Sequence, residues 1–224
     1  MTRYTVNNWD SYLSIPLYVT ALTVTDSSCN DNTITVVDLS SFKFLRSVVI
    51  GNSCFQYVQL FSIVGLNWLE SVSIGSSSFT YYDSSLKSSE LKIVNCPQLK
   101  RLYIGASSFF RYNGFELSEL PQLKSVEIVS DRYNHGNSFG IAPKAVFRDL
   151  PSLETIDLGY YVFQYAEYVV FENLPKLTVL RLGSYCLVGS TSTKTTNISP
   201  YYYKNTLIMR SMYVNSSNHQ IYHL

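Results

Sequence analysis

Two histidines late in the chain have the spacing of a metal-binding pair. His219 and His223 are four residues apart, so on a helix both imidazoles would project from one face and could ligate zinc. No carboxylate or cysteine stands beside them, and the surrounding residues do not indicate a helix. The sequence therefore predicts no metal site here.

Other residues with acid–base or nucleophilic chemistry are also isolated. Asp131 and His135 are close in sequence, but no nucleophile in a strained turn accompanies them, as a catalytic triad would require. Cys54, in the segment GNSCF, resembles a nucleophile, yet the segments GSSSF and GASSF carry Ser at the same place. Glycine motifs that bind phosphate are missing as well. The sequence predicts no catalytic residues, no cofactor and no enzyme activity.

The composition narrows the class of protein further. Of 224 residues, 46% are apolar and 15% are charged, which is typical of a folded chain. A net charge of +1 gives no reason to expect a nucleic-acid partner. The chain has no apolar run of about 18 residues, so no membrane span is expected, and its polar N-terminus does not resemble a signal peptide. Four scattered cysteines favour buried thiols and a reducing, cytoplasmic compartment.

One segment of eleven residues occurs six times along the chain. Numbered from its first Leu, each copy has apolar residues at positions 1, 4, 6 and 11, and five of the six copies have Gly at position 7. The alternation at positions 4 and 6 predicts a strand with one buried face. Position 7 is where we expect the chain to turn, with a glycine whose φ can be positive. The copies are LRSVVIGNSCF (45–55), LESVSIGSSSF (69–79), LKRLYIGASSF (99–109), LKSVEIVSDRY (123–133), LETIDLGYYVF (153–163) and LTVLRLGSYCL (177–187).

A second apolar set precedes each copy, at positions −8, −6 and −3. Its first two members again have the spacing of a strand, and in four copies a proline follows at position −2, where the chain should turn a corner. The set is Val37/Leu39/Phe42, Phe61/Ile63/Leu66, Leu91/Ile93/Cys96, Phe115/Leu117/Leu120, Ala145/Phe147/Leu150 and Val169/Phe171/Leu174.

Degenerate copies extend the array at both ends. Residues 19–24 match a first copy, and residues 209–214 match a last one, with Tyr201 and Tyr203 at its positions −8 and −6. Shorter and longer intervals alternate between the first leucines of the six clear copies, which are Leu45, Leu69, Leu99, Leu123, Leu153 and Leu177. We expect a capping segment at 1–16, which carries Trp9 and Tyr12, a solenoid of seven to eight repeats at 17–214 and a tail at 215–224.

The motif LxxVxIGxxSF, combined with LPxL, resembles the leucine-rich repeat family in its BspA-like and protist variants. The resemblance covers nearly the whole chain. It implies an α/β-type repeat solenoid that is mainly β, with a single parallel sheet, one strand per repeat and little helix. The family commonly has Asn at position 9, whereas this chain has Ser, Asp or Tyr there. We therefore expect aromatic stacking at position 11 to hold neighbouring repeats together.

Two surfaces remain for binding. Positions 3 and 5 of the predicted strands face solvent, and position 5 changes character from copy to copy while the buried columns hardly vary. The second surface is formed by inserts at every second repeat, around residues 80–89, 134–143 and 188–203, which we expect to stack into one ridge. The candidate contacts are Arg101, Tyr103, Glu127, Asp157 and Arg181 on the strand face, and Tyr81, Tyr82, His135 and Phe139 on the inserts.

These features favour a non-catalytic module that recognises or scaffolds a protein partner, as the family resemblance implies. One alternative is a targeting or regulatory domain of a larger enzyme, because some leucine-rich repeat proteins carry kinase, phosphatase or ubiquitin-ligase domains outside the repeats. Another is a cell-surface adhesion protein, which the BspA-like resemblance suggests.

Overall fold

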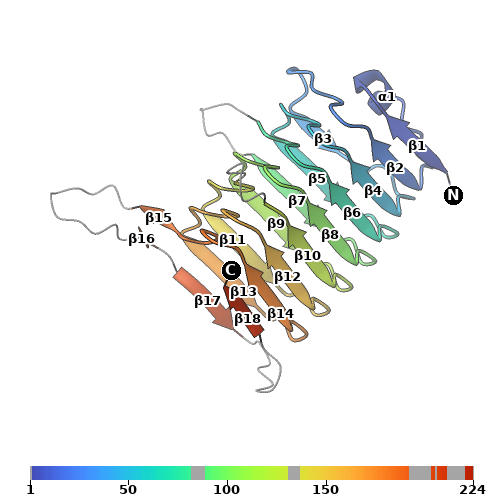
Figure 1. The fold of residues 1–224 in the computed structure, drawn as a ribbon. Coiled ribbons are helices and arrows are strands. Elements are labelled where there is room, and N and C mark those ends of the chain that lie inside the picture. Colours follow the sequence, from blue (N-terminus) through green and yellow to red (C-terminus); the bar gives the residue numbers. More distant parts are fainter. Residues whose placement is uncertain are drawn as a thin grey trace.

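A parallel sheet of nine strands runs the length of the molecule (Figure 1). The computed structural model describes residues 2–81, 89–130, 137–191, 203–204, 206–210 and 220–223. Within these, each coil of the chain adds one strand to the large sheet, in the order β1-β2-β4-β6-β8-β10-β12-β14-β18. These strands are β1 (Arg3–Val6), β2 (Ala21–Val24), β4 (Ser47–Ile50), β6 (Ser71–Ile74), β8 (Arg101–Ile104), β10 (Ser125–Ile128), β12 (Thr155–Leu158), β14 (Val179–Leu182) and β18 (Gln220–His223).

The strands predicted from the six copies are confirmed in position, direction and order. Equivalent residues of successive copies lie opposite one another, so that Val48 pairs with Val72 and Val72 with Leu102. Positions 4 and 6 face inward in every copy, and positions 3 and 5 face outward. The parallel repeat solenoid is therefore the fold of this chain.

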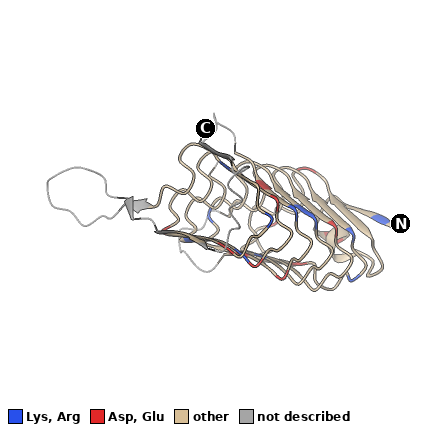
Figure 2. Cartoon of the chain, turned by 90° about the horizontal axis from the view of Figure 1, so that it is seen from below, with Lys and Arg blue, Asp and Glu red and all other residues tan. Residues whose placement is uncertain are grey.

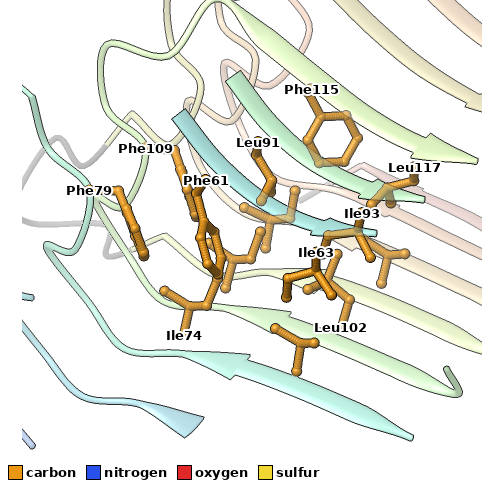
Figure 3. Close-up of a cluster of buried hydrophobic side chains, with 14 of the residues drawn as sticks. Phe61, Ile63, Ile74, Phe79, Leu91, Ile93, Leu102, Phe109, Phe115 and Leu117 are labelled. Carbon is orange, nitrogen blue, oxygen red and sulfur yellow. The ribbon is translucent and has the colours of Figure 1, made fainter. Parts of the chain in front are cut away.

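The opposite side of the solenoid is also formed by parallel strands, which make up two further sheets beside the single one expected. Positions −8 and −6 of the second apolar set lie in these strands in all copies but the first, where only position −8 does, because their alternating pattern buries one face of each strand. One group of strands is β3 (Val36–Asp38), β5 (Leu60–Val64), β7 (Glu90–Val94) and β9 (Gly114–Ser118); beside β9 begins a second group, β11 (Lys144–Arg148), β13 (Tyr168–Glu172) and β17 (Thr206–Arg210). Apolar side chains from the large sheet and from the strands opposite it meet inside the solenoid and form one continuous core (Figure 3).

Aromatic rings at position 11 form a stack along the core. Phe55, Phe79, Phe109, Phe139 and Phe163 are buried, and successive ring centroids are 5.3, 4.8, 5.1 and 5.1 Å apart. Their planes differ by 20° or less, so the rings lie nearly parallel. The stacking expected between repeats is thus present in five successive coils.

The ring in the fourth copy is Phe139, and the assignment of Tyr133 to this position was wrong. Phe139 lies between Phe109 and Phe163 in the stack, and its φ of 54° falls within the 51–56° range of all five members. In this copy the insert comes between the strand and the turn. Asn137, Ser138 and Phe139 therefore occupy positions 9, 10 and 11, which the other copies reach without an insert. Tyr133 itself lies outside the described residues.

Serine hydroxyls at position 10 form a buried hydrogen-bond ladder beside this stack. The Ser78 hydroxyl accepts a hydrogen bond from the backbone N–H of Cys54 (3.0 Å) and donates one to the Gly51 carbonyl (2.9 Å). One coil further on, Ser108 bonds the N–H of Ser78 (3.1 Å) and the Gly75 carbonyl (2.7 Å) in the same way. Position 10, and not position 9, therefore supplies the side-chain ladder that joins neighbouring turns.

Glycine occurs at position 7 for a different reason from the one predicted. The positive φ angles occur two and four residues later, at positions 9 and 11, and not at these glycines. A Cβ on Gly75 would lie 2.6 Å from the backbone of Gly51 in the preceding coil, and a Cβ on Gly105 would lie 2.6 Å from the backbone nitrogen of Ser76. Glycine is needed because the backbones of adjacent coils approach too closely for a side chain.

The expected capping segment holds one strand and the short helix α1 (Trp9–Leu13). Asn8 and Ser11 form a capping box at the start of the helix, with the N–H of Ser11 donating to Asn8 Oδ1 (2.8 Å). Tyr12 stacks on Trp9 (4.6 Å) and meets the edge of Phe55 (6.1 Å), so α1 covers the first ring of the stack. Strand β1 also extends the large sheet beyond β2.

The last coil differs from the sequence prediction. The match at residues 209–214 was assigned to the large sheet, but Met209 lies in β17, which pairs with β13 on the opposite side. The strand that joins the large sheet there is β18, inside the expected tail. Tyr203, which was expected in the core, lies in β16 (Tyr203–Lys204), antiparallel to β15 (Ser190–Thr191). Tyr201 lies outside the described residues.

Candidate interaction surface

The outward side of the large sheet carries the predicted strand-face residues in a row. The register places Tyr103 opposite Glu127, Glu127 opposite Asp157, and Asp157 opposite Arg181, on four adjacent strands. Tyr103 is 37% exposed, and Arg101 leaves the same strand on the same face. The structure therefore brings all five predicted strand-face residues onto one continuous surface.

Ion pairing divides this row into two parts. The Arg181 guanidinium donates to the Asp157 carboxylate at 3.2 Å, so each of these charges already has a partner. In the described part of the chain, neither Arg101 nor Glu127 belongs to an ion pair. A ligand would meet the charges of Arg101 and Glu127 without first breaking an ion pair among the described residues. Tyr103 lies on the same strand as Arg101 and directly opposite Glu127.

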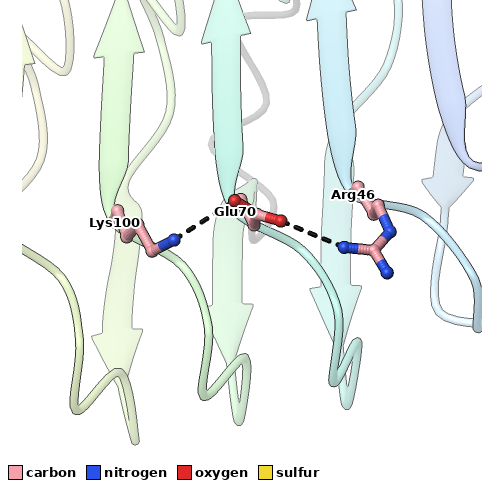
Figure 4. A network of polar contacts seen from close by, with 3 residues as sticks. All are labelled: Arg46, Glu70 and Lys100. Carbon is pink, nitrogen blue, oxygen red and sulfur yellow. Dashed lines mark hydrogen bonds and ion pairs between the residues drawn. The ribbon is translucent and has the colours of Figure 1, made fainter.

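A second polar row lies at position 2, where the chain enters each strand of the large sheet. Glu70 accepts from Arg46 and from Lys100, each at 3.2 Å, and so bridges three adjacent coils (Figure 4). The Lys100 ammonium, followed by the Arg46 guanidinium, holds the pKa of Glu70 below its ordinary value. Basic and acidic residues are interspersed along the coils and do not separate by sign (Figure 2). Over the described residues, the surface thus offers local charge pairs and no broad basic face.

The insert surface is described only in part. Tyr81 is half-buried and packs against the core, which leaves less of its ring for a partner than a loop residue would have. Phe139 is buried in the aromatic stack and is not a surface contact. Tyr82 and His135 lie outside the described residues. Each insert falls between a strand of the large sheet and the next strand on the other side, but the expected ridge stays a prediction.

Three thiols and one tyrosine hydroxyl lie in the core. Cys29, Cys54 and Cys96 are buried free thiols, and burial raises the pKa of Cys29 to about 12. The Tyr112 hydroxyl donates to the Val58 carbonyl at 2.7 Å inside the core, and its burial raises its pKa. Within the described residues, no three His, Cys, Asp or Glu side chains gather as a metal site would need. His219 lies outside those residues.

The described helices include none with the length and apolar character needed to cross a membrane. Comparison of the chain with models of protein families found no match, and comparisons with curated proteins and with solved structures also found none.

Proposed function

We propose that this chain is a non-catalytic protein-recognition module of the leucine-rich repeat type, which binds its partner on the outward face of β8 and β10. The observation that carries the proposal is the exposed group Arg101, Tyr103 and Glu127, whose charges have no ion-pair partner among the described residues. Tyr and Arg are the residue types that most often contribute strongly to binding at protein interfaces. A parallel solenoid presents such side chains at fixed spacing on a broad sheet.

The arrangement favours a partner with a particular chemistry. Tyr103 offers an apolar ring with a hydroxyl, and Glu127 lies directly opposite it on the next strand. A partner with an apolar side chain beside a Lys or Arg would fill both contacts. Arg101 would then favour a carboxylate or carbonyl on the same partner, two residues along the strand from Tyr103.

Alanine substitution tests this site once a pull-down with the chain as bait has supplied a partner. Tyr103→Ala should weaken binding by about 1–2 kcal/mol and leave the melting profile unchanged. Val49→Ala is the matched control, because Val49 is 43% exposed in the same row, two strands away. If Tyr103→Ala binds normally and Tyr81→Ala or Tyr82→Ala loses affinity, the site lies on the inserts and the strand-face proposal is wrong.

A further inference from the structure

A second exposed surface lies at the corner where the first three coils enter the large sheet. Tyr18, Phe44 and Trp68 occupy the third residue of three equivalent turns, and we call them the turn aromatic row. Each turn is closed by a backbone hydrogen bond, from Val19 to Pro16 (3.0 Å), Leu45 to Phe42 (3.0 Å) and Leu69 to Leu66 (3.3 Å). The three aromatic residues are 64%, 56% and 52% exposed.

The same turn recurs in the later coils without an aromatic residue. It is closed by hydrogen bonds of 3.0–3.2 Å, with Pro as the second residue and a polar residue as the third. The third residues there are Gln98, Gln122, Ser152 and Lys176. The turn therefore forms equally well with a polar residue, and the fold does not explain three large rings in water. Adjacent exposed apolar residues of this kind mark interaction sites.

One member of the row is fixed in place by its neighbours. The Arg46 guanidinium lies 5.4 Å from the centroid of the Trp68 ring and is itself held by Glu70, which also binds Lys100. A cation over an aromatic ring stabilises its orientation. Because the indole is already ordered, a ligand that stacks on its exposed side loses less side-chain entropy on binding.

The spacing of the row matches one kind of ligand. Strands in a sheet are about 4.8 Å apart, so the turns of Tyr18 and Trp68, two coils apart, are separated by roughly 9.6 Å. A polyproline II helix repeats every three residues at about 3.1 Å per residue, or roughly 9.3 Å. Aromatic-lined surfaces recognise this conformation in proline-rich segments. We propose that the turn aromatic row binds an extended proline-rich segment of a partner protein, with two prolines three residues apart packing against Tyr18 and Trp68 and with the Phe44 ring between them.

The local charge argues against an anionic membrane as the occupant. Arg46, two residues after Phe44, shares the carboxylate of Glu70 with Lys100, so much of their charge is neutralised. Lys43, directly before Phe44, donates to the Gly65 carbonyl at 3.4 Å and lies close enough to Asp38 to lower the pKa of that carboxyl, so its charge also has an acidic neighbour. The proposal also does not depend on the strand-face site, because the row lies in the turns before the strands and in coils that precede β8. Each proposal can fail while the other stands.

Fluorescence anisotropy of a labelled decaproline peptide tests the proposal directly. Phe44→Gln should weaken binding about tenfold or more, because the central ring contributes to both proline contacts. Gln is already the third residue of two later turns, so this variant should keep the wild-type melting profile. Gln122→Ala is the matched control and should bind as the wild type does. Gln98→Trp extends the row by one coil and should tighten binding.

Several results would overturn the proposal. These are no binding of decaproline by the wild type up to about 1 mM, equal binding of a Gly-Ser decamer, or equal affinity of the Phe44→Gln variant. If decaproline does not bind, the wild type can be sedimented with phosphatidylserine-containing vesicles. Sedimentation of the wild type but not of Phe44→Gln would assign the row to a membrane surface. If decaproline does not bind and the wild type forms a dimer that Phe44→Gln does not form, the turn aromatic row is assigned to a second copy of the chain.

Discussion

The inward and outward sides of the large sheet follow different rules, although their residues alternate along the same strands. Inward positions repeat the same residue types from coil to coil, such as isoleucine at Ile50, Ile74 and Ile104. The five stacked phenylalanines continue this repetition in the turns that follow the strands. Outward positions change at nearly every strand, from Val49 and Tyr103 to Glu127 and Arg181. An inward side chain must fit the copies before and after it, whereas an outward one meets water. Binding specificity can therefore vary on the outer face without disturbing the stack.

The sharpest test of this contrast is the central ring of the stack. Phe109 contacts Phe79 at 4.8 Å, Phe139 at 5.1 Å and the edge of Tyr112 at 4.8 Å between ring centroids. Phe109→Ala should lower the free energy of unfolding by about 3–5 kcal/mol, because it leaves a cavity and breaks these contacts. Denaturant unfolding measures the loss. A loss below about 1 kcal/mol would show that this column does not control the packing.

Backbone contact between coils should give the next largest effect. Gly105→Ala places a Cβ 2.6 Å from the backbone nitrogen of Ser76, and backbone cannot move aside cheaply. We expect a loss of about 1–3 kcal/mol in thermal or denaturant unfolding. Gly114→Ala is the control, because its Cβ would meet mainly the flexible side chain of Glu90, at 2.8 Å. Equal losses for the two variants would contradict the close-approach explanation.

The serine ladder should contribute a similar or smaller amount. Ser108→Ala leaves the buried N–H of Ser78 and the carbonyl of Gly75 without this hydroxyl partner. The expected loss is about 1–3 kcal/mol, the usual penalty for a buried polar group that loses its hydrogen bond. Ser73→Ala, on the outward face of β6, should be nearly neutral in the same melts. A neutral Ser108→Ala would mean that the ladder does not hold the turns together.

Outward substitutions should change stability much less than the inward ones. Glu127→Ala should shift the free energy of unfolding by no more than about 0.5 kcal/mol, because the carboxylate is exposed and has no ion-pair partner in the described chain. The same denaturant series used for Phe109→Ala measures it. A loss as large as that of Phe109→Ala would mean that the two faces are exchanged, as a one-residue shift in register would do.

The smallest effect concerns Glu70 and depends on pH. Its folded-state pKa is lowered by Lys100 and Arg46, so the charged carboxylate stabilises the folded chain above the unfolded pKa, near 4.5, and this contribution is lost as pH falls through the folded pKa. Glu70→Gln should therefore be slightly less stable than wild type near neutral pH and equal to it in acid. The gap should also shrink in high salt. A difference that persists at low pH would point to packing and not to charge.

Much of the fold was predictable because six copies kept the same spacing. The period-two pattern at positions 4 and 6 determined which residues face inward, and the structure confirms it from β4 to β14. The pattern could not place the insert in the fourth copy, because Tyr133 and Phe139 are both aromatic and only the three-dimensional stack distinguishes them. It also could not assign Met209, since strands on both sides of the solenoid have the same apolar alternation.

The candidate surfaces were predicted less completely. The strand face followed directly from the register, but the ion pair between Asp157 and Arg181 depends on side-chain conformations that the pattern does not contain. The serine ladder was missed because position 10 mixes Ser, Cys and Val, although a small polar residue beside a buried ring in several copies was a usable signal. The turn aromatic row was also visible, since Tyr18, Phe44 and Trp68 each precede position 1.

The constant register between coils has a consequence for how the chain folds. Ser47 pairs with Ser71 in the next coil, and Ser71 pairs with Arg101 in the coil after that. Each new strand therefore closes a loop of similar length, so the entropic cost of adding a coil hardly rises as the array grows. Strands pair with those of the neighbouring coils, and not with strands much further away in the sequence, whose pairing usually slows the folding of β proteins. A coil formed early in synthesis can act as the template for the next one while the rest of the chain is still being made.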